Sequence, residues 1–300
     1  MPLPTKNSLA FPFPMLDGNI PIWNGSDFCL GNQLVKVLEY GANNNGWTDD
    51  LTEFHEETAG ENHFIDKASR QHALDQIQNY VKGKNAIILE IGCSSGFMLD
   101  AMQKLFSKHI IIGSDVVRTP LIKLSQKIHG IPLLRFDLVD CPLPDNSVDV
   151  VVMLNVLEHI ENDLGALRQV KRILKHGGIA IIEVPAGPNL YDIYDKLLMH
   201  YRRYSIACLQ KKVKTAGFDI KKKSHLGFFI YPGFWFVKQR NKRLLEKSVI
   251  AQQQQVEKNI RDTGNNKILD GLMQLELLFG KKITYPIGVR CLMTCKKPVL

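Results

Sequence analysis

Residues 86–96 constrain the fold of this chain more than any other segment, because an apolar run, an acid and a turn of small residues follow one another there. Residues 86–91 have the continuous apolar character of a strand that is buried on both faces. Gly92 and Gly96 allow the backbone to turn sharply and a ligand to approach it, while Glu90 places a carboxylate near the strand end. In an open parallel sheet, ligands bind at this edge. The segment therefore predicts a strand-to-helix turn that binds a ligand.

Four further apolar runs follow, and they cover residues 109–115, 131–137, 148–155 and 179–184. Stretches of helical character separate the runs, so we expect parallel strands joined by right-handed crossovers. The first of these runs ends at Asp115, nineteen residues beyond Gly96. This separation is typical of an acid that binds a ribose, whose hydroxyls would donate to both carboxylate oxygens. The pattern therefore indicates an α/β fold with a nucleoside-containing ligand.

A nicotinamide dinucleotide would bind a similar strand, turn and helix, but its glycine spacing does not fit this chain. The pattern Gly-x-Gly-x-x-Gly requires glycine at two positions that hold Ser94 and Phe97. A phenylalanine at the third glycine position would also disturb the close packing of helix on strand. Glu90 suits a positively charged amino group and would repel a pyrophosphate. The residues therefore disfavour a dinucleotide.

The order of these motifs resembles that of the class I S-adenosylmethionine-dependent methyltransferases, specifically the small-molecule branch called type 11. The resemblance covers residues 60–225 and, more loosely, the final strand near 287–297. It implies a Rossmann-like doubly wound seven-stranded sheet, mostly parallel with an antiparallel last strand, and S-adenosyl-L-methionine as the cofactor. In the family motif acid-x-Gly-x-Gly-x-Gly, Ser94 replaces the middle glycine of this chain. The cofactor-binding residues that the resemblance implies are Glu90, Gly92, Cys93, Ser94, Gly96, Asp115, Asp137, Leu138 and Asn155.

Methyl transfer needs in-line alignment of the acceptor with the methyl carbon and sulfur and, for some acceptors, a base. His159 is the first candidate base, because Leu157-Glu158-His159 resembles the family's leucine-glutamate-histidine signature. His200 is the second. We expect no metal, since Cys291 and Cys295 are the only close cysteines and have no histidine near them in the sequence.

Two segments resemble parts of this branch that face the substrate. Residues 61–64 precede the first strand, and there His63 and Phe64 would fold over the cofactor and the acceptor. Residues 200–204 resemble a His-x-Arg-x-aromatic element behind the fifth strand. Its members Arg202, Arg203 and Tyr204 would face the acceptor, and the arginines would hold a carboxylate or phosphate by paired hydrogen bonds.

Composition divides the chain into three parts. Residues 1–60 contain clusters of Pro, Gly and Asn and are expected to form an irregular N-terminal arm. Residues 61–237 and 281–300 are expected to form the methyltransferase domain, with a sixth strand at 225–231 and a seventh at 288–295. Residues 238–280 are expected to form a helical insertion, with apolar residues at helical spacing from Ile268 to Leu278, that serves as a lid or a dimer contact.

Charge is distributed unevenly along the chain, with a balance of −6 over residues 1–150 and +14 over residues 151–300. The basic half would attract an anionic substrate or bring the chain to an acidic membrane surface, and solvated helix faces would explain it equally well. A nucleic-acid partner is not favoured, because no RNA-recognition signature or zinc finger accompanies the charge. We expect a cytoplasmic protein with reduced cysteines, because the N-terminal residues lack a signal-peptide pattern and the longest late apolar run is interrupted by Pro232.

The sequence therefore predicts a methyltransferase that acts on a small acceptor, sugar-linked or lipid-linked and anionic if the basic residues contact it. A macromolecular acceptor, protein or RNA, is the first alternative. The second alternative is a scaffold with a methyltransferase fold that binds the cofactor poorly, because Ser94 departs from the glycine motif. A homodimer is compatible with the insertion.

Overall fold

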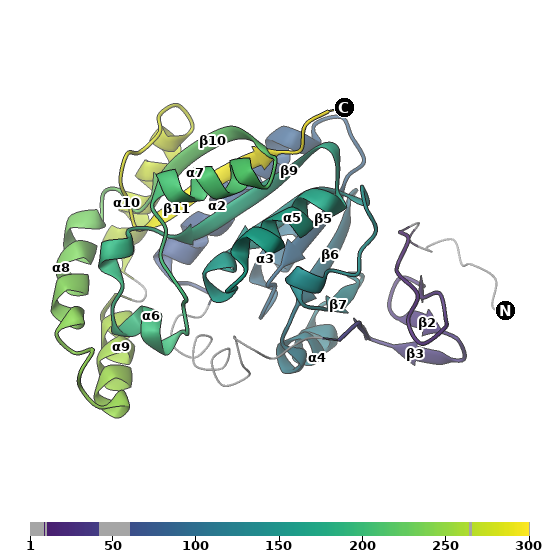
Figure 1. The fold of residues 1–300 in the computed structure, drawn as a ribbon, viewed down its shortest axis with the longest axis horizontal. Helices are drawn as coiled ribbons and strands as arrows, with labels where there is room; N and C mark the ends of the chain where they lie inside the picture. The colour runs from purple at the N-terminus through teal and green to yellow at the C-terminus, as the bar shows by residue number, and fades with distance from the viewer. Residues whose placement is uncertain (1–8, 10, 42–60, 264–265, 300) are drawn as a thin grey trace.

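The computed structural model describes residues 9, 11–41, 61–263 and 266–299, and residues 1–8, 10 and 42–60 of the expected arm lie outside them. An eight-stranded sheet forms the centre of the molecule, with helices on both of its faces (Figure 1). Across the sheet lie β10 (Asp219–Leu226), β11 (Arg290–Lys296), β9 (Leu174–Pro185), β8 (Val148–Leu154), β5 (Ile87–Ile91), β6 (Ile110–Asp115), β7 (Leu133–Arg135) and β4 (Val37–Glu39).

The order of the strands fixes the place where a ligand binds. From β4 to β9 all neighbouring strands are parallel, and β11 runs antiparallel to both β9 and β10. The mostly parallel sheet and its antiparallel last strand are therefore as the sequence predicts. The chain proceeds from β5 to β6 on one side and returns later to β8 on the other side of β5. Such a reversal of strand order opens a crevice at the carboxyl ends of the two central strands.

Alternating side chains of the central strands form two apolar layers. Ile88 of β5 packs with α2 (Phe64–Val81), α3 (Phe97–Leu105) and α4 (Arg118–Lys127). Leu89, the next residue, packs on the opposite face with α5 (Asp163–Ile173) and α7 (Ile206–Thr215). Because successive side chains of a strand point to opposite faces, a strand buried on both faces is apolar at every position. This explains the continuous apolar run of residues 86–89, which Glu90 ends.

The sixth strand, expected at residues 225–231, is displaced toward the N-terminus. It is β10, and only its last two residues fall in the expected range. Gly227 ends it with a φ of 84°, and α8 (Tyr231–Lys242) begins four residues later with Pro232 in its first turn. The three lysines at 221–223 belong to the basic half of the chain. They lie within this edge strand, where charge discourages pairing with another chain.

The described part of the arm is more regular than expected. A small antiparallel sheet contains β1 (Ile22–Trp23), β2 (Phe28–Leu30) and β3 (Gln33–Val35), and β4 then extends the main sheet beside β7. Phe28 is fully buried, with its ring centroid 4.7 Å from that of Trp23. Strands of two or three residues are too short to show an alternating pattern, and therefore the sequence did not reveal them.

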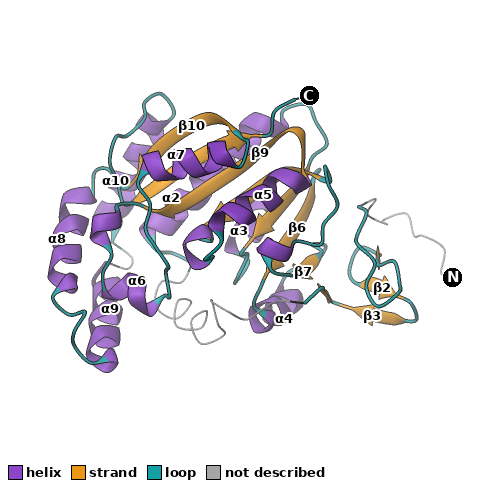
Figure 2. Ribbon diagram, in the orientation of Figure 1, coloured by secondary structure: helices purple, strands orange, loops and turns teal. Residues whose placement is uncertain are grey.

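Helices occupy the region expected to be a helical insertion (Figure 2). They are α8, which begins at residue 231, α9 (Val249–Thr263) and α10 (Lys267–Gly280). The α10 helix packs against α2, and Lys67 forms an ion pair with Asp270 at 2.6 Å. Its apolar stripe is not a core face, since Ile268 and Leu278 are 75% and 63% exposed. Among the described residues, no helix is long and apolar enough to cross a membrane.

Candidate functional site

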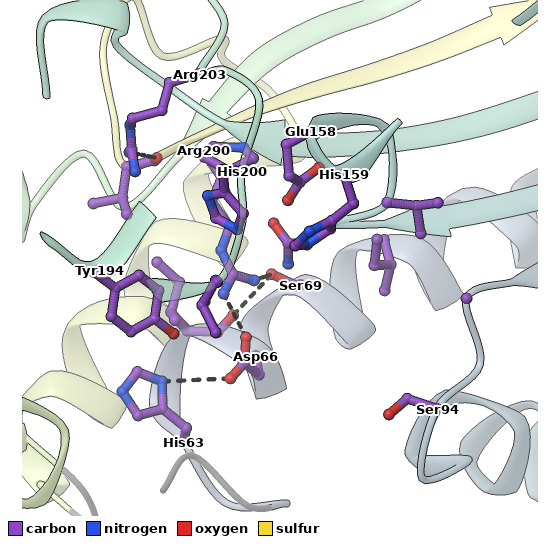
Figure 3. A pocket seen from close by; sticks show the side chains of 18 of the residues that line it. His63, Asp66, Ser69, Ser94, Glu158, His159, Tyr194, His200, Arg203 and Arg290 are labelled. Atoms are coloured by element: carbon purple, nitrogen blue, oxygen red, sulfur yellow. Dashed lines mark hydrogen bonds and ion pairs between the residues drawn. The ribbon is translucent and has the colours of Figure 1, made fainter. Parts of the chain in front are cut away.

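A cavity of about 1030 Å³ opens at the carboxyl ends of the central strands. Residues that follow β5, β6, β7, β8 and β9 line one side of it. The first turns of α2 together with α8 and α10 line the other. Sites that bind one drug-sized molecule rarely have a larger volume. The cavity can therefore hold a nucleoside and a second ligand together. Figure 3 shows the part of this cavity that contains its histidines.

The turn after β5 has the shape that its small residues predict. Gly92, Ser94 and Gly96 have φ angles of 75°, 42° and 79°. A Cβ atom on Gly92 would lie 2.6 Å from Val156 Cγ2, so only glycine fits there without a shift of this side chain. Ser94 occupies a conformation that favours glycine, and its side chain faces the cavity. Gly96 caps α3 and does not line the cavity itself.

Asp115 connects the turn to the end of β6. Its Oδ2 accepts a hydrogen bond from the Ser94 backbone N–H at 2.8 Å, and its Oδ1 accepts one from the Val117 N–H at 3.0 Å. Burial raises the pKa of the Asp115 carboxyl, while these two backbone donors lower it. A carboxylate oxygen has room for a second donor, so the carboxylate can hold the turn and still accept hydrogen bonds from a ribose.

Glu90 is buried at the end of β5 and lines the cavity. Its Oε2 has no hydrogen-bond partner among the described residues. Burial, followed by the neighbouring Asp115, raises the pKa of Glu90 well above its ordinary value, and Arg70 opposes this shift. A buried carboxyl oxygen without a partner costs free energy, and a cationic ligand would remove this cost.

The remaining residues expected to bind the cofactor also lie at this edge. Asp137 caps the short 3₁₀ helix η1 (Leu138–Asp140), accepting a hydrogen bond from Val139 N–H at 2.9 Å, and Leu138 is buried beside it. Cys93 lies buried in the turn, where burial raises the pKa of its thiol. Asn155 has a φ of 55° and donates to Glu183 Oε1 at 3.3 Å. All of them line the cavity.

The two histidines expected to act as bases meet in the cavity, although 41 residues separate them in the chain. The ring centroids of His159 and His200 lie 4.6 Å apart in an edge-to-face arrangement. Glu158 is fully buried beside them, in the 3₁₀ helix η2 (Leu157–His159). Neither of its carboxyl oxygens has a hydrogen-bond partner among the described residues, and burial raises its pKa to about 8. The sequence signature named Glu158 without indicating a role for it.

A buried network of charges orients His200. Its Nδ1 lies 2.8 Å from Asp195 Oδ1, the same oxygen that accepts from Arg203 at 2.9 Å. Lys238 of α8 donates to the other oxygen of Asp195 at 2.9 Å and to Asp192 at 2.6 Å. Although burial opposes ionisation, Lys238, His200 and Arg203 hold the pKa of the Asp195 carboxyl well below its ordinary value. Asp195 therefore accepts hydrogen bonds only, and Nδ1 of His200 must carry the proton.

The arginines expected to hold an anionic acceptor are engaged within the chain. Arg203 is buried and donates to Ala186 O, Asp195 and Val289 O. Arg202 lies outside the cavity lining and donates to the carbonyl oxygens of Ile160 and Glu161, with Asp163 at 3.1 Å.

The structure also places Tyr204 elsewhere than the sequence predicts. It is buried in the core, outside the cavity lining, and donates to Asp163 Oδ2 at 2.8 Å. We therefore correct the expectation that Arg202 and Tyr204 contact the acceptor. Arg203 does line the cavity, but its donors are engaged within the chain. Buried carboxylates close in space, which the sequence does not reveal, take up these donors.

His63 and Phe64 lie at the cavity, where the sequence places them. Their ring centroids are 4.5 Å apart, and His63 Nδ1 is 3.6 Å from Asp66 Oδ2 (Figure 3). Phe64 is buried at the start of α2.

An ion-pair cluster that the sequence does not reveal joins α2 to β11. Arg290 pairs with Asp66 and Glu183, at 2.7 Å for the latter, and also donates to Ser69 Oγ at 2.6 Å. Arg290, Asp66 and Ser69 line the cavity. More than 200 residues separate Arg290 from α2, and no local pattern predicts such a pairing.

Comparison with known proteins agrees with this geometry. Residues 89–182 match the family model of the type 11 methyltransferase domain. A probable S-adenosylmethionine-dependent methyltransferase of Mycolicibacterium smegmatis is 28% identical over 136 residues, which are 45% of this chain and 52% of the relative. A demethylmenaquinone methyltransferase of Staphylococcus epidermidis is 29% identical over 143 residues, 44% of this chain and 58% of the relative. The chain thus matches about half of the length of these curated relatives.

Two solved structures share the fold. One is a putative sarcosine dimethylglycine methyltransferase of Galdieria sulphuraria, with a TM-score of 0.55 and 14% identity over 83% of this chain and 99% of the other. The second is a putative methyltransferase of Haloferax volcanii in complex with the Trm112 methyltransferase activator. It has a TM-score of 0.53 and 16% identity over 83% of this chain and 95% of the other.

Proposed function

Since residues 89–182 belong to the class I S-adenosylmethionine-dependent methyltransferases of the type 11 branch, we propose that this chain transfers the methyl group of S-adenosylmethionine to a small lipid-linked acceptor. The observation that carries the proposal is Glu90, whose buried and unpartnered carboxyl oxygen faces the cavity beside the glycine turn. It fits the positively charged amino group of the cofactor.

The residues of the cavity suit each part of the cofactor. Asp115 would accept hydrogen bonds from the ribose hydroxyls, and Asp137 with Leu138 would meet the adenine amino group and ring. Glycine is required at position 92 of the turn, because a Cβ atom there would lie 2.6 Å from Val156 Cγ2. The cofactor supplies a sulfonium-bound methyl group that is already electrophilic. The chain therefore needs to align the acceptor and exclude water.

The far wall of the cavity supports an acceptor with an apolar part. It is lined by Phe229 and Ile230 just ahead of α8, by Phe234 within α8, and by Leu269 and Leu272 of α10. Ligand sites are mostly apolar with a few placed polar groups, and this wall has that character. We therefore propose that α8 and α10 form the acceptor compartment, which is the lid role expected of residues 238–280. Because Arg202 and Arg203 are engaged within the chain, an anionic group on the acceptor is no longer part of the proposal.

His159 and His200 line the same cavity as the glycine turn and the apolar wall and would face the reacting atom of the acceptor. The fold thus brings two histidines that are distant in the sequence to the same site. A methyl acceptor of macromolecular size would have to enter past α8 and α10. The lipid-linked acceptor is favoured because the apolar side chains lie inside the cavity.

Two measurements test the proposal. Calorimetric titration with S-adenosylmethionine should give one site per chain, and Glu90→Gln should weaken it, whereas Glu246→Gln, at an exposed position, should not. Transfer of a labelled methyl group should then be followed in a cell extract divided into lipid, water-soluble, protein and RNA fractions. Label in the lipid fraction supports the proposal, and label confined to protein or RNA contradicts the acceptor. Cofactor binding with no transfer to any fraction would identify a scaffold.

A further inference from the structure

Glu158, His159 and His200 bring three metal-binding side chains to one point of the cavity. Each offers a carboxylate oxygen or an imidazole nitrogen, and these atoms lie within 4.8 Å of one another. Figure 3 shows the side chains of Glu158, His159 and His200 close to one another. We propose that these three residues hold a divalent transition-metal ion of the zinc type in the acceptor compartment. This replaces the general-base role that the sequence suggests for the two histidines.

Glu158 gives the strongest argument. Its side chain is fully buried, and neither carboxyl oxygen has a hydrogen-bond partner among the described residues. Buried carboxyl groups are paired, hydrogen-bonded or bound to a metal, because an isolated one is costly. Arg203 and Arg290 act on Glu158 electrostatically, but their guanidinium groups are bound to other acceptors. A cation between Glu158 and the two imidazoles would satisfy both oxygens.

His200 is oriented as a metal ligand would be. Its Nδ1–H donates to Asp195, a carboxylate that Lys238 and Arg203 also bind. The proton on Nδ1 leaves a lone pair on Nε2. A carboxylate behind a ligating histidine is the usual support of such a ligand, since it fixes the tautomer and the ring orientation. The short distance between the rings of His159 and His200 is consistent with two imidazoles on one ion.

The ligand set indicates the class of ion. Two imidazole nitrogens and one carboxylate oxygen suit zinc and its neighbours, whereas Mg²⁺ and Ca²⁺ prefer oxygen ligands throughout. Three protein ligands leave a coordination position open, as in catalytic sites, and this position faces the cavity.

The open position also specifies the acceptor, in a step that rests on the proposed function. A hydroxyl oxygen of the acceptor would bind there and release its proton to water, because the ion lowers its pKa. The oxygen then forms a bond to the methyl carbon while the carbon–sulfur bond of the cofactor breaks. S-adenosylhomocysteine leaves as the neutral thioether, so the charges and atoms balance. The metal would thus select a hydroxyl acceptor.

The test uses the full chain without a histidine tag, stripped with a chelator and titrated with Co²⁺ and Zn²⁺. We expect one ion per chain, a visible Co²⁺ absorption band, and displacement by Zn²⁺ but not by Mg²⁺. Glu158→Gln and His200→Ala should each weaken Zn²⁺ binding at least 100-fold, and Asp195→Asn by about 10- to 100-fold. His176→Ala, at an exposed histidine outside the cavity, should leave binding unchanged.

Two outcomes would overturn the site: no Co²⁺ band in the unaltered protein, or equal Zn²⁺ affinity in Glu158→Gln, His200→Ala and the His176→Ala control. Each variant is also titrated with S-adenosylmethionine, so a variant that fails to fold is recognised by loss of both ligands. If methyl transfer proceeds in the stripped protein, the metal inference fails while the proposed function stands. If the cofactor does not bind, the proposed function fails whatever the metal does.

Discussion

Replacement of Asp115 by asparagine tests the cofactor edge most directly, because this carboxylate has two tasks. Its oxygens accept one hydrogen bond each from the backbone N–H groups of Ser94 and Val117. An asparagine side chain keeps the shape but has only one acceptor oxygen, so its NH₂ group must face one of these two donors. We therefore expect Asp115→Asn to be almost as harmful as Asp115→Ala.

The magnitude follows from the groups involved. One buried N–H donor without an acceptor lowers the free energy of unfolding by about 1–3 kcal/mol. Loss of the charged acceptor for the ribose hydroxyls weakens cofactor binding by roughly 2–4 kcal/mol, which corresponds to about 30- to 700-fold in the dissociation constant.

Calorimetric titration with S-adenosylmethionine and urea unfolding measure the two effects separately. Asp145→Asn is a matched control, because the Asp145 carboxylate is 66% exposed and pairs with Arg172 away from the cavity. An Asp115→Asn variant with the cofactor affinity of the control would refute the ribose assignment. A variant that binds poorly but unfolds like the control would refute the argument about the turn.

Three further changes give distinct expectations. Ser94→Gly removes the Cβ atom from a residue at a φ of 42° and should relieve about 1 kcal/mol of strain. Stability against urea should therefore rise, and cofactor affinity should be equal or higher. A tenfold loss of cofactor affinity would identify the Ser94 hydroxyl as a ligand. Burial raises the pKa of Glu90 above the usual range of glutamate, and a cationic ligand needs the ionised form, so cofactor affinity should fall as the pH is lowered through that raised pKa. Glu90→Gln should abolish this pH dependence in calorimetric titrations. Parallel pH profiles of the two proteins would contradict the pairing of Glu90 with the cofactor. Arg203→Ala should lower the free energy of unfolding by roughly 3 kcal/mol, because buried Asp195 loses a partner. Arg202→Ala should leave the KM for the acceptor unchanged, because Arg202 lies outside the cavity lining. A raised KM for Arg202→Ala would return this residue to the substrate site.

The residues at the ends of parallel strands could be predicted from the sequence. Glu90, Asp115 and Asp137 end or follow separate apolar runs, and the carboxyl ends of parallel strands meet at one edge of a sheet. Local sequence therefore determines where these side chains go.

The partners of the basic residues could not be predicted in this way. The sequence shows the charge of Arg202 and Arg203 but not the carboxylates that approach them in the fold. Arg290 meets Asp66 only after the entire sheet has formed, because β11 is its last strand in the chain. The arm was misjudged for another reason, since strands of two or three residues have no period to recognise.

The β4 strand has a consequence for where this domain begins. Residues 37–39 cover β7, and Glu39 forms ion pairs with Arg118 and Arg135, so the outermost strand of the sheet is short and carries paired charges. A chain shortened to begin at residue 61 would uncover the backbone N–H and C=O groups of β7. Such an uncovered strand readily pairs with other molecules. A minimal version for expression should therefore start ahead of residue 37, and insolubility of the shorter version would reflect an open sheet edge rather than a failure of the core.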